Sequence, residues 1–233
     1  MKTIGLIGGM SWESSAVYYE LINQRVKAQL GGFHSCKCML LSVDFAEFET
    51  FLRQENWSAI NDRLCDAAQK LEAAGADLLI LCTNTMHICS EGIRQAVSIP
   101  FLHIAEATAE AIKAQGLDKV GLLGTRFTME KDFYKETLRA QGIDVIVPRK
   151  AARDQVDEIV FRELVMGEIK EDSRRAYQRI IKELEEEGAQ GVVLGCTEIP
   201  LLISGEDVDI PVFDTTTIHA ELAVDWALGV LVR

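Results

Sequence analysis

The stretch Leu79-Ile80-Leu81-Cys82-Thr83-Asn84-Thr85-Met86-His87 is an apolar run that stops abruptly at small polar side chains. A second copy of this pattern is Val192-Val193-Leu194-Gly195-Cys196-Thr197-Glu198. A short, continuous apolar run bounded by polar residues is typical of a buried parallel strand. We therefore predict two such strands, with reactive side chains at their carboxyl ends, where open α/β sheets bind ligands.

The two stretches belong to an internal duplication of the chain. Three pairs of positions correspond at nearly constant offsets: Thr83 with Cys196 (196 − 83 = 113), Gly5 with Gly121 (121 − 5 = 116) and Pro100 with Pro211 (211 − 100 = 111). Repeated self-similarity of this kind indicates two structurally similar halves, and the drift in offset indicates small insertions in loops.

Strand and helix patterns alternate in both halves. Strands are predicted at 3–8, 39–43, 77–81, 98–104, 119–125, 145–147, 190–195 and 209–214. Helices are predicted at 60–74, 91–97, 106–115, 127–141, 156–166, 173–187 and 218–231, after a first helix that ends at Gly31. This alternation predicts an α/β fold of two pseudo-symmetric three-layer α/β/α domains, each with a mainly parallel four-stranded sheet. The expected domains are 1–98 plus 209–233 and 99–208, with the last helix packing on the first half and the active site in the interdomain cleft.

Composition narrows the classes of function. The 233 residues carry a net charge of −12, which argues against a nucleic-acid partner or an anionic membrane surface. The N-terminal apolar run is too short for a signal sequence, and no apolar run is long enough for a transmembrane helix, so we expect a cytoplasmic protein. The six cysteines are scattered and form no pair of C-x-x-C clusters, so no metal site is predicted.

Side chains from two duplicated strand ends suit the inversion of a stereocentre. That reaction removes a proton from one face of a carbon and delivers another to the opposite face, which two flanking acid/base groups do best. A thiol suits this task because thiol and thiolate are both accessible near neutral pH. Cys196, at the end of the second strand, is the residue predicted to act in this way.

Three motifs together resemble the aspartate/glutamate racemase family, closest to its broad-specificity amino-acid racemase branch: Gly8-Gly9-Met10-Ser11-Trp12-Glu13-Ser14, Cys82-Thr83-Asn84-Thr85-Met86-His87 and Gly195-Cys196-Thr197-Glu198. The resemblance covers essentially the whole chain. It implies amino-acid racemisation by a two-base mechanism without pyridoxal phosphate, other cofactor or metal, in a protein that is often a homodimer.

The chain departs from the family pattern at the first catalytic cysteine. That position is Thr83, one residue after Cys82. Successive side chains of a strand point to opposite faces, so Cys82 is predicted to be a core residue. The resemblance includes a Thr/Cys branch, which assigns Thr83 and Cys196 as the catalytic pair. A threonine hydroxyl is a poor base without an activating group, so slow and asymmetric turnover is expected.

The other predicted site residues surround this pair. Those assigned to substrate binding are Met10, Ser11, Asn84, Thr85, Thr125, Thr197 and Glu198. Glu198 has three open interpretations: it binds the substrate ammonium, tunes Cys196, or complements a helix dipole. His87 either helps to activate the site or is a hydrogen-bonded structural residue.

Two alternatives to an amino-acid racemase stay open. The first is a related enzyme, such as a hydantoin racemase or an arylmalonate-decarboxylase-like protein. These enzymes use the same scaffold with one or two cysteines, and a single cysteine is compatible with one-sided proton delivery. The second is a non-catalytic protein that binds a small molecule between two α/β lobes. A thiol at the strand end argues against the second, because binding alone does not need one.

Overall fold

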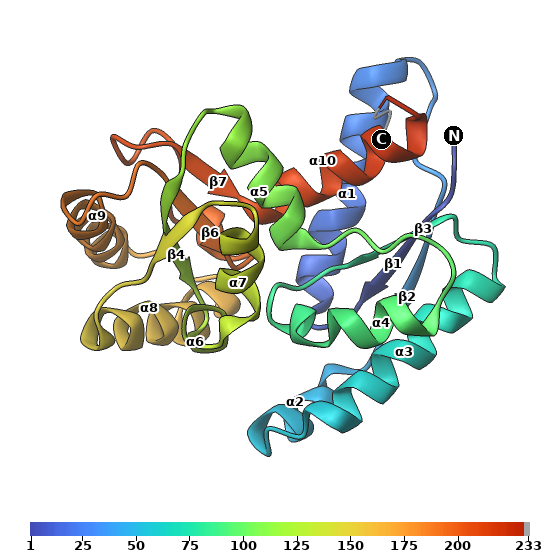
Figure 1. The fold of residues 1–233 in the computed structure, drawn as a ribbon, viewed down its shortest axis with the longest axis horizontal. Helices are drawn as coiled ribbons and strands as arrows, with labels where there is room; N and C mark the ends of the chain where they lie inside the picture. The colour runs from blue at the N-terminus through green and yellow to red at the C-terminus, as the bar shows by residue number, and fades with distance from the viewer. Residues whose placement is uncertain (231–233) are drawn as a thin grey trace. The chain divides into compact units, whose positions relative to one another are not determined.

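Two compact units make up the chain in the computed structural model, which describes residues 1–230 (Figure 1). Unit 1 comprises residues 1–104 and the segment from His219, and unit 2 comprises residues 105–218. The expected boundaries at 98/99 and 208/209 therefore move to 104/105 and 218/219. The reason is that the segments after Pro100 and Pro211 each pair with the sheet of their own half, Phe101 with Leu79 and Val212 with Val192. The chain passes to the other unit only in the helix that follows each segment.

Unit 1 contains a parallel sheet in the order β2-β1-β3. Its strands are β1 (Ile4–Gly8), β2 (Cys38–Ser42) and β3 (Leu78–Leu81). The predicted fourth strand at 98–104 is reduced to a single parallel bridge between Phe101 and Leu79. The helices are α1 (Trp12–Leu30), α2 (Phe45–Arg53), α3 (Trp57–Ala73), the 3₁₀ helix η1 (Thr85–Cys89) and α4 (Ser90–Ala96).

Alternating side chains of this sheet divide the unit into three layers. Ile7, Leu79 and Leu81 pack with α3, whereas Ile4, Leu6 and Ile80 pack on the opposite face with α1 and α10 (Thr215–Leu228). Arg25 of α1 also donates to both carboxylate oxygens of Asp225 in α10, at 3.0 and 2.7 Å. The predicted packing of the last helix on the first half is confirmed.

Unit 2 contains the predicted four-stranded parallel sheet, in the order β5-β4-β6-β7. The strands are β4 (Lys119–Gly124), β5 (Asp144–Ile146), β6 (Val192–Gly195) and β7 (Val212–Asp214). The other elements are α5 (Ile104–Ala114), α6 (Arg126–Glu130), α7 (Asp132–Ala140), α8 (Lys150–Arg162), η2 (Leu164–Met166), α9 (Glu171–Glu186) and η3 (Ile199–Leu201). The helix predicted at 127–141 is interrupted at Lys131, whose backbone is extended with ψ 155°.

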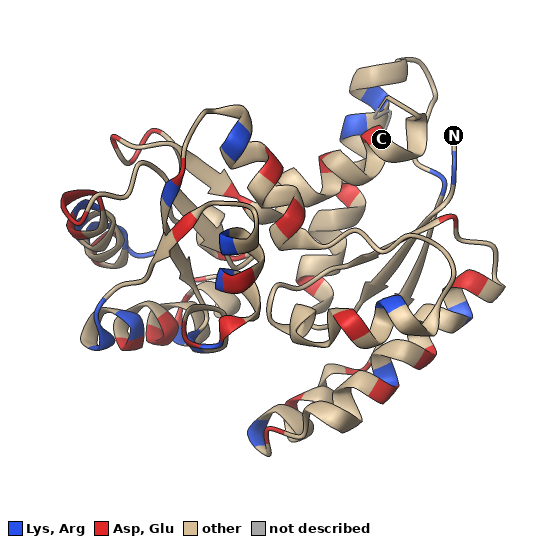
Figure 2. Cartoon of the chain, in the orientation of Figure 1, with Lys and Arg blue, Asp and Glu red and all other residues tan. Residues whose placement is uncertain are grey.

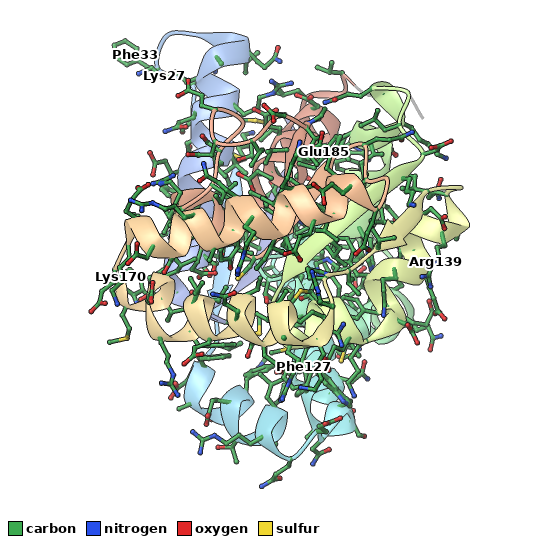
Figure 3. The ribbon with its side chains drawn as sticks, turned by 90° about the vertical axis from the view of Figure 1, so that its left-hand side faces the viewer. Lys27, Phe33, Phe127, Arg139, Lys170 and Glu185 are labelled. Carbon is green, nitrogen blue, oxygen red and sulfur yellow. The ribbon has the colours of Figure 1, made fainter. Side chains whose placement is uncertain are left out.

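Side-chain alternation also layers unit 2. Leu123, Val192 and Leu194 face α8 and α9, which run side by side in Figure 3. Helices α5 and α7 lie on the other side of the sheet and are joined by the hydrogen bond between Thr108 Oγ1 and Tyr134 Oη at 3.0 Å (Figure 1). The α/β class with parallel sheets is thus confirmed in both units.

Charges lie on the outer faces of the helices. Both acidic and basic side chains lie along α8, as Figure 2 shows, and two pairs form at i,i+4 spacing: Lys150 with Asp154 at 2.7 Å and Arg162 with Glu158 at 3.2 Å. Within residues 1–230, no helix has the length and apolar character needed to cross a membrane.

Gly9 gives a test of the loop that follows β1. Its φ is +95°, and an added Cβ would lie 2.2 Å from the carbonyl oxygen of Val43. We expect Gly9→Ala to lower the free energy of unfolding by more than the roughly 1–3 kcal/mol that a strained backbone conformation costs alone. Gly75→Ala is the matched control, because Gly75 has φ +99° and open space at the Cβ position. Urea unfolding that shows equal losses for the two variants would contradict the close contact at Val43.

Candidate active site

The predicted site residues of unit 1 lie where adjacent parallel strands end. Ile7 of β1 is in register with Leu81 of β3, so the segments after both strands leave the same edge of the sheet. Met10 and Ser11 follow β1, and Thr83, Asn84 and Thr85 follow β3. Asn84 and Met10 are buried, while Ser11, Thr83 and Thr85 are half-buried.

The loop after β1 is held by serines of α1. Ser11 caps the helix, its Oγ accepting from the Ser14 N–H at 3.2 Å. The buried Ser15 hydroxyl accepts from the Gly9 N–H at 2.8 Å and donates to the Ser11 carbonyl at 3.0 Å. Ser15 was missed by sequence reasoning, because a serine on the inner face of a helix carries no signal of its loop partners.

Cys82 and Thr83 have different surroundings, as predicted from strand alternation. The Cys82 amide continues the β ladder to the Ile7 carbonyl at 2.9 Å, and its thiol is buried with the core between the sheet, α1 and α10. Burial raises the pKa of the Cys82 thiol. Thr83 then donates its N–H to the Leu81 carbonyl at 2.9 Å, a three-residue turn that takes the chain out of the strand. Cys82 is therefore a core residue.

The site residues of unit 2 lie at the corresponding edge of the second sheet. Gly124 of β4 is in register with Gly195 of β6, so Thr125 and Cys196 are the next residues of two neighbouring strands. Thr125 is the N-cap residue of α6, and its Oγ1 lies 3.3 Å from that of Thr128. Thr197 and Glu198 follow Cys196 and are half-buried.

Glu198 receives two hydrogen bonds on one carboxylate oxygen. The Cys196 thiol donates to Oε2 at 2.9 Å, and the Thr197 hydroxyl donates to the same oxygen at 2.7 Å. Of the three interpretations of Glu198, this contact fits the tuning of Cys196.

The Cys196 thiol is kept protonated by its surroundings. It is 8% exposed, and its pKa is raised well above the ordinary value, first by burial and then by the Glu198 carboxylate. Asp157 of α8 adds to this effect and also accepts the Arg126 N–H at 2.7 Å. Sequence reasoning missed Asp157, because nothing in the local pattern of α8 indicates its proximity to β6. Cys196 is thus a proton donor with a carboxylate in direct contact.

His87 is hydrogen-bonded at both ring nitrogens and fully buried. Nδ1 lies 2.8 Å from the Thr83 carbonyl oxygen, and Nε2 accepts the Ile104 N–H at 3.2 Å. Burial lowers its pKa well below the ordinary value, with smaller contributions from His103 and His219. Burial also lowers the pKa of His103 to about 3 and that of His219 to about 4.

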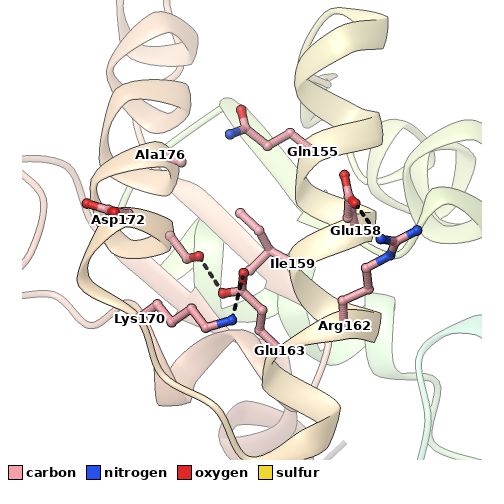
Figure 4. Close-up of a pocket in the computed structure, with 9 residues that line it drawn as sticks. Gln155, Glu158, Ile159, Arg162, Glu163, Lys170, Asp172 and Ala176 are labelled. Carbon is pink, nitrogen blue, oxygen red and sulfur yellow. Dashed lines mark hydrogen bonds and ion pairs between the residues drawn. The ribbon is translucent and has the colours of Figure 1, made fainter.

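A separate pocket in unit 2 contains none of the predicted site residues. It has a volume of about 440 Å³ and lies between α8 and α9 (Figure 4). Four of its charged side chains form two pairs: Arg162 with Glu158 at 3.2 Å, and Lys170 with Glu163 at 3.5 Å. Among residues 1–230, no group of three or more His, Cys, Asp or Glu side chains is placed to hold a metal ion.

The family of the chain follows from comparison with known proteins. The model of the Asp/Glu/hydantoin racemase family matches residues 7–223. The chain belongs to this family. Its members include racemases, so the resemblance carried by the three sequence motifs is confirmed at the level of the family.

Several members of the racemase family are similar over most of the chain. A putative Asp/Glu racemase from Yersinia pestis has 53% identity and a TM-score of 0.94, covering 98% of this chain and 100% of that one. An aspartate racemase homologue from Pyrococcus horikoshii OT3 has 37% identity and a TM-score of 0.87 over the same shares. The broad specificity amino-acid racemase RacX from Bacillus subtilis is 28% identical over 166 residues, 71% of each chain.

The buried histidines predict an acid-sensitive stability. They stay neutral in the folded protein, with pKa values of about 4 for His219 and about 3 for His103, but titrate near 6.5 when unfolded. The unfolded state therefore binds more protons as the pH falls from 6.5 toward those values, and stability falls with it. Each of the three buried histidines, His87, His103 and His219, is expected to lower the free energy of unfolding by about 1 kcal/mol between pH 6.5 and 5.5.

Urea unfolding across this pH range measures the effect. His219→Gln retains a donor toward the Leu102 carbonyl but cannot titrate, so its loss of stability should be smaller by about a third of the wild-type loss. His34→Gln changes an exposed histidine and is the control. A wild-type stability that is flat from pH 6.5 to 5.5 would contradict neutral burial.

The contact between Glu198 and Cys196 gives a second test. Glu198→Gln removes a negative charge beside the thiol, so the pKa of Cys196 should fall while burial keeps it above the ordinary value. The rate of iodoacetamide labelling at Cys196, followed by peptide mass spectrometry against pH, should rise at a lower pH than in the wild type. Asp154→Asn removes an exposed carboxylate of the same unit and should leave the profile unchanged. An unshifted profile in Glu198→Gln would show that the carboxylate does not tune the thiol.

Proposed function

We propose that this protein is a cofactor-independent amino-acid racemase that inverts the α-carbon by proton transfer, with Cys196 on one face and Thr83 on the other. The observation that carries the proposal is the buried Cys196 thiol in contact with Glu198 at a strand end of a racemase-family chain. The position of Thr83 at the corresponding strand end of the first half supports its role. The cleft between the halves, the homodimer and the cytoplasmic location stay predictions.

The protonated state of Cys196 sets the direction of its first step. When Thr83 and its activating group remove the α-proton, the Cys196 S–H bond breaks and a new C–H bond forms on the opposite face. The thiolate left behind is the base for the reverse reaction. In the resting protein, the raised pKa keeps Cys196 in the thiol state, with its proton directed at Glu198 Oε2, 2.9 Å away.

Substrate binding is assigned to the small polar groups around the two strand ends. Asn84, Thr85 and Thr197 offer amide and hydroxyl donors for the substrate carboxylate, and Ser11 and Thr125 add hydroxyls at the neighbouring strand ends. Met10 gives an apolar wall. None of these groups selects a particular substrate side chain, which is consistent with broad specificity of the kind that RacX has by name.

A second candidate is a reaction that needs one cysteine alone. A hydroxyl and a thiol differ in acidity, and one-sided proton delivery from Cys196 suits an arylmalonate-decarboxylase-like enzyme, whereas a hydantoin racemase would use both positions. The family description itself includes hydantoin racemases. Substrate screening therefore includes 5-substituted hydantoins and arylmalonates beside amino acids.

The test is α-proton exchange in D₂O with each enantiomer of a panel of amino acids, followed by NMR and chiral chromatography. Wild type should incorporate deuterium from both enantiomers at unequal rates. In Cys196→Ser, the rate of exchange for the enantiomer whose α-proton faces Cys196 should fall at least about 100-fold. This factor is the lower end of the rate acceleration that general acid–base catalysis provides. Thr83→Ala should abolish exchange of the other enantiomer and leave exchange with retention at Cys196.

Other results of the same experiment exclude the proposal. If Cys196→Ser exchanges the α-proton at the full wild-type rate, the thiol has no central role in the reaction. Activity on hydantoins or arylmalonates, with none on amino acids, would establish the second candidate. The matched control is Cys65→Ser, a half-buried thiol of α3, which should leave every rate unchanged.

A further inference from the structure

The hydrogen bonds of His87 determine which of its nitrogens carries the proton. A carbonyl oxygen only accepts, so Nδ1 must donate to Thr83; a backbone amide only donates, so Nε2 must accept from Ile104. Both bonds exist together only in the neutral Nδ1–H tautomer. The ring is therefore a bridge with a fixed direction between two backbone groups.

The first of these groups belongs to the predicted catalytic residue. Thr83 lies between the end of β3 and the start of η1, where the ladder no longer holds the chain. Its N–H is used in the turn to Leu81, and its carbonyl is held by His87 at 2.8 Å. Movement of this peptide would move the Thr83 hydroxyl with it.

The second group lies where the chain leaves unit 1. Ile104 is the last residue of the first segment of unit 1 and the first residue of α5. A first-turn N–H has no partner within its own helix, and His87 Nε2 supplies one. His219, where the chain returns to unit 1, donates from Nε2 to the Leu102 carbonyl at 3.0 Å, and its Nδ1 accepts from Tyr18 Oη at 2.8 Å. Both passages of the chain between units are thus anchored by buried histidines.

The second half holds the carbonyl of the corresponding residue, Cys196, in a different way. The offset of 113 that relates Thr83 to Cys196 places Pro200 at the position of His87 (87 + 113 = 200). The Cys196 carbonyl accepts instead from the nearby Ile199 N–H at 3.3 Å. The link from the end of β6 to the start of α10 is made two residues earlier, where the Thr215 hydroxyl donates to the Leu194 carbonyl at 2.9 Å. The Thr83 carbonyl is therefore bound by a distant side chain, and the Cys196 carbonyl by a nearby backbone N–H.

We propose that His87 is a positioning residue for Thr83: it holds the Thr83 peptide against the start of α5 and so places the Thr83 hydroxyl for proton transfer. The inference rests on the proposed racemase function and adds a residue that touches neither substrate nor the reacting atoms. Loss of a merely structural histidine would slow proton transfer through Thr83 and proton transfer through Cys196 equally. A positioning residue affects the Thr83 side selectively.

Two substitutions separate the two hydrogen bonds. In His87→Asn, the amide nitrogen takes the place of Nδ1, which retains the bond to the Thr83 carbonyl and loses the acceptor for Ile104. In His87→Gln, the amide oxygen takes the place of Nε2, which retains the bond from Ile104 and loses the donor to Thr83. Each variant thus removes one end of the bridge and is the control for the other.

The readout is the ratio of deuterium exchange from the two enantiomers in a single preparation, which cancels any loss of folded protein. The Thr83-dependent enantiomer is the one whose exchange Thr83→Ala abolishes. We expect His87→Gln to lower its kcat at least tenfold with little change in KM, because a displacement of about 1 Å costs up to about 100-fold. Exchange through Cys196 should stay within threefold of wild type, and His87→Asn should restore most of the lost rate.

Each other outcome overturns the inference. If His87→Gln lowers both exchanges by the same factor, or if His87→Asn is as slow as His87→Gln on the Thr83 side, His87 has no positioning role while the racemase proposal stands. If wild type exchanges no amino acid, both proposals fall. Long-range ¹H–¹⁵N NMR of the imidazole rings gives a reading independent of activity: a protonated Nε2 on His87 in the wild-type protein at pH 7 would contradict the bridge.

Discussion

Parallel pairing of β1 with β3, and of β4 with β6, determines where the candidate site residues lie. Parallel strands end at the same edge of their sheet. The residues after Gly8 and Leu81 therefore share one edge of the first sheet, and those after Gly124 and Gly195 share the corresponding edge of the second sheet. A shift of register by one residue would exchange Cys82 and Thr83 between core and edge. The chemistry of the strand ends therefore depends on backbone pairing that is itself fixed by buried apolar side chains.

Burial then decides the protonation states at these edges. It raises the pKa of Cys196 and lowers the pKa of His87 and His219, so that in each case the uncharged form is favoured. Neutral groups can be packed without a counter-ion, but they must be hydrogen-bonded. The Cys196 thiol therefore donates to Glu198, and both imidazoles bridge backbone or tyrosine partners.

The sequence predicted most of the strands because apolar runs and polar ends are local signals. The same is true of Cys82, since side-chain alternation along β3 places it with Ile80 in the core. Features that depend on distant partners were not accessible. The bonds of His87, for example, reach a residue 17 positions away. The charge of Asp157 reaches Cys196 only through the packing of α8 on β6. Helix α2 was missed for a different reason: its local cap, Asp44, is equally typical of a strand end.

The two halves hold equivalent carbonyls by different means, and this difference has a physical consequence. The Cys196 carbonyl accepts from Ile199 within one turn, a bond that forms with the local backbone and costs little additional ordering. The Thr83 carbonyl depends on a side chain that also binds the start of α5, so its position is linked to a segment that is distant in sequence. Deleting one partner of such a buried bridge leaves an unsatisfied polar group, which costs more than the bond itself contributes. The duplication has therefore produced one strand-end carbonyl, at Cys196, that is held by a local backbone bond and one, at Thr83, that is held by a distant side chain.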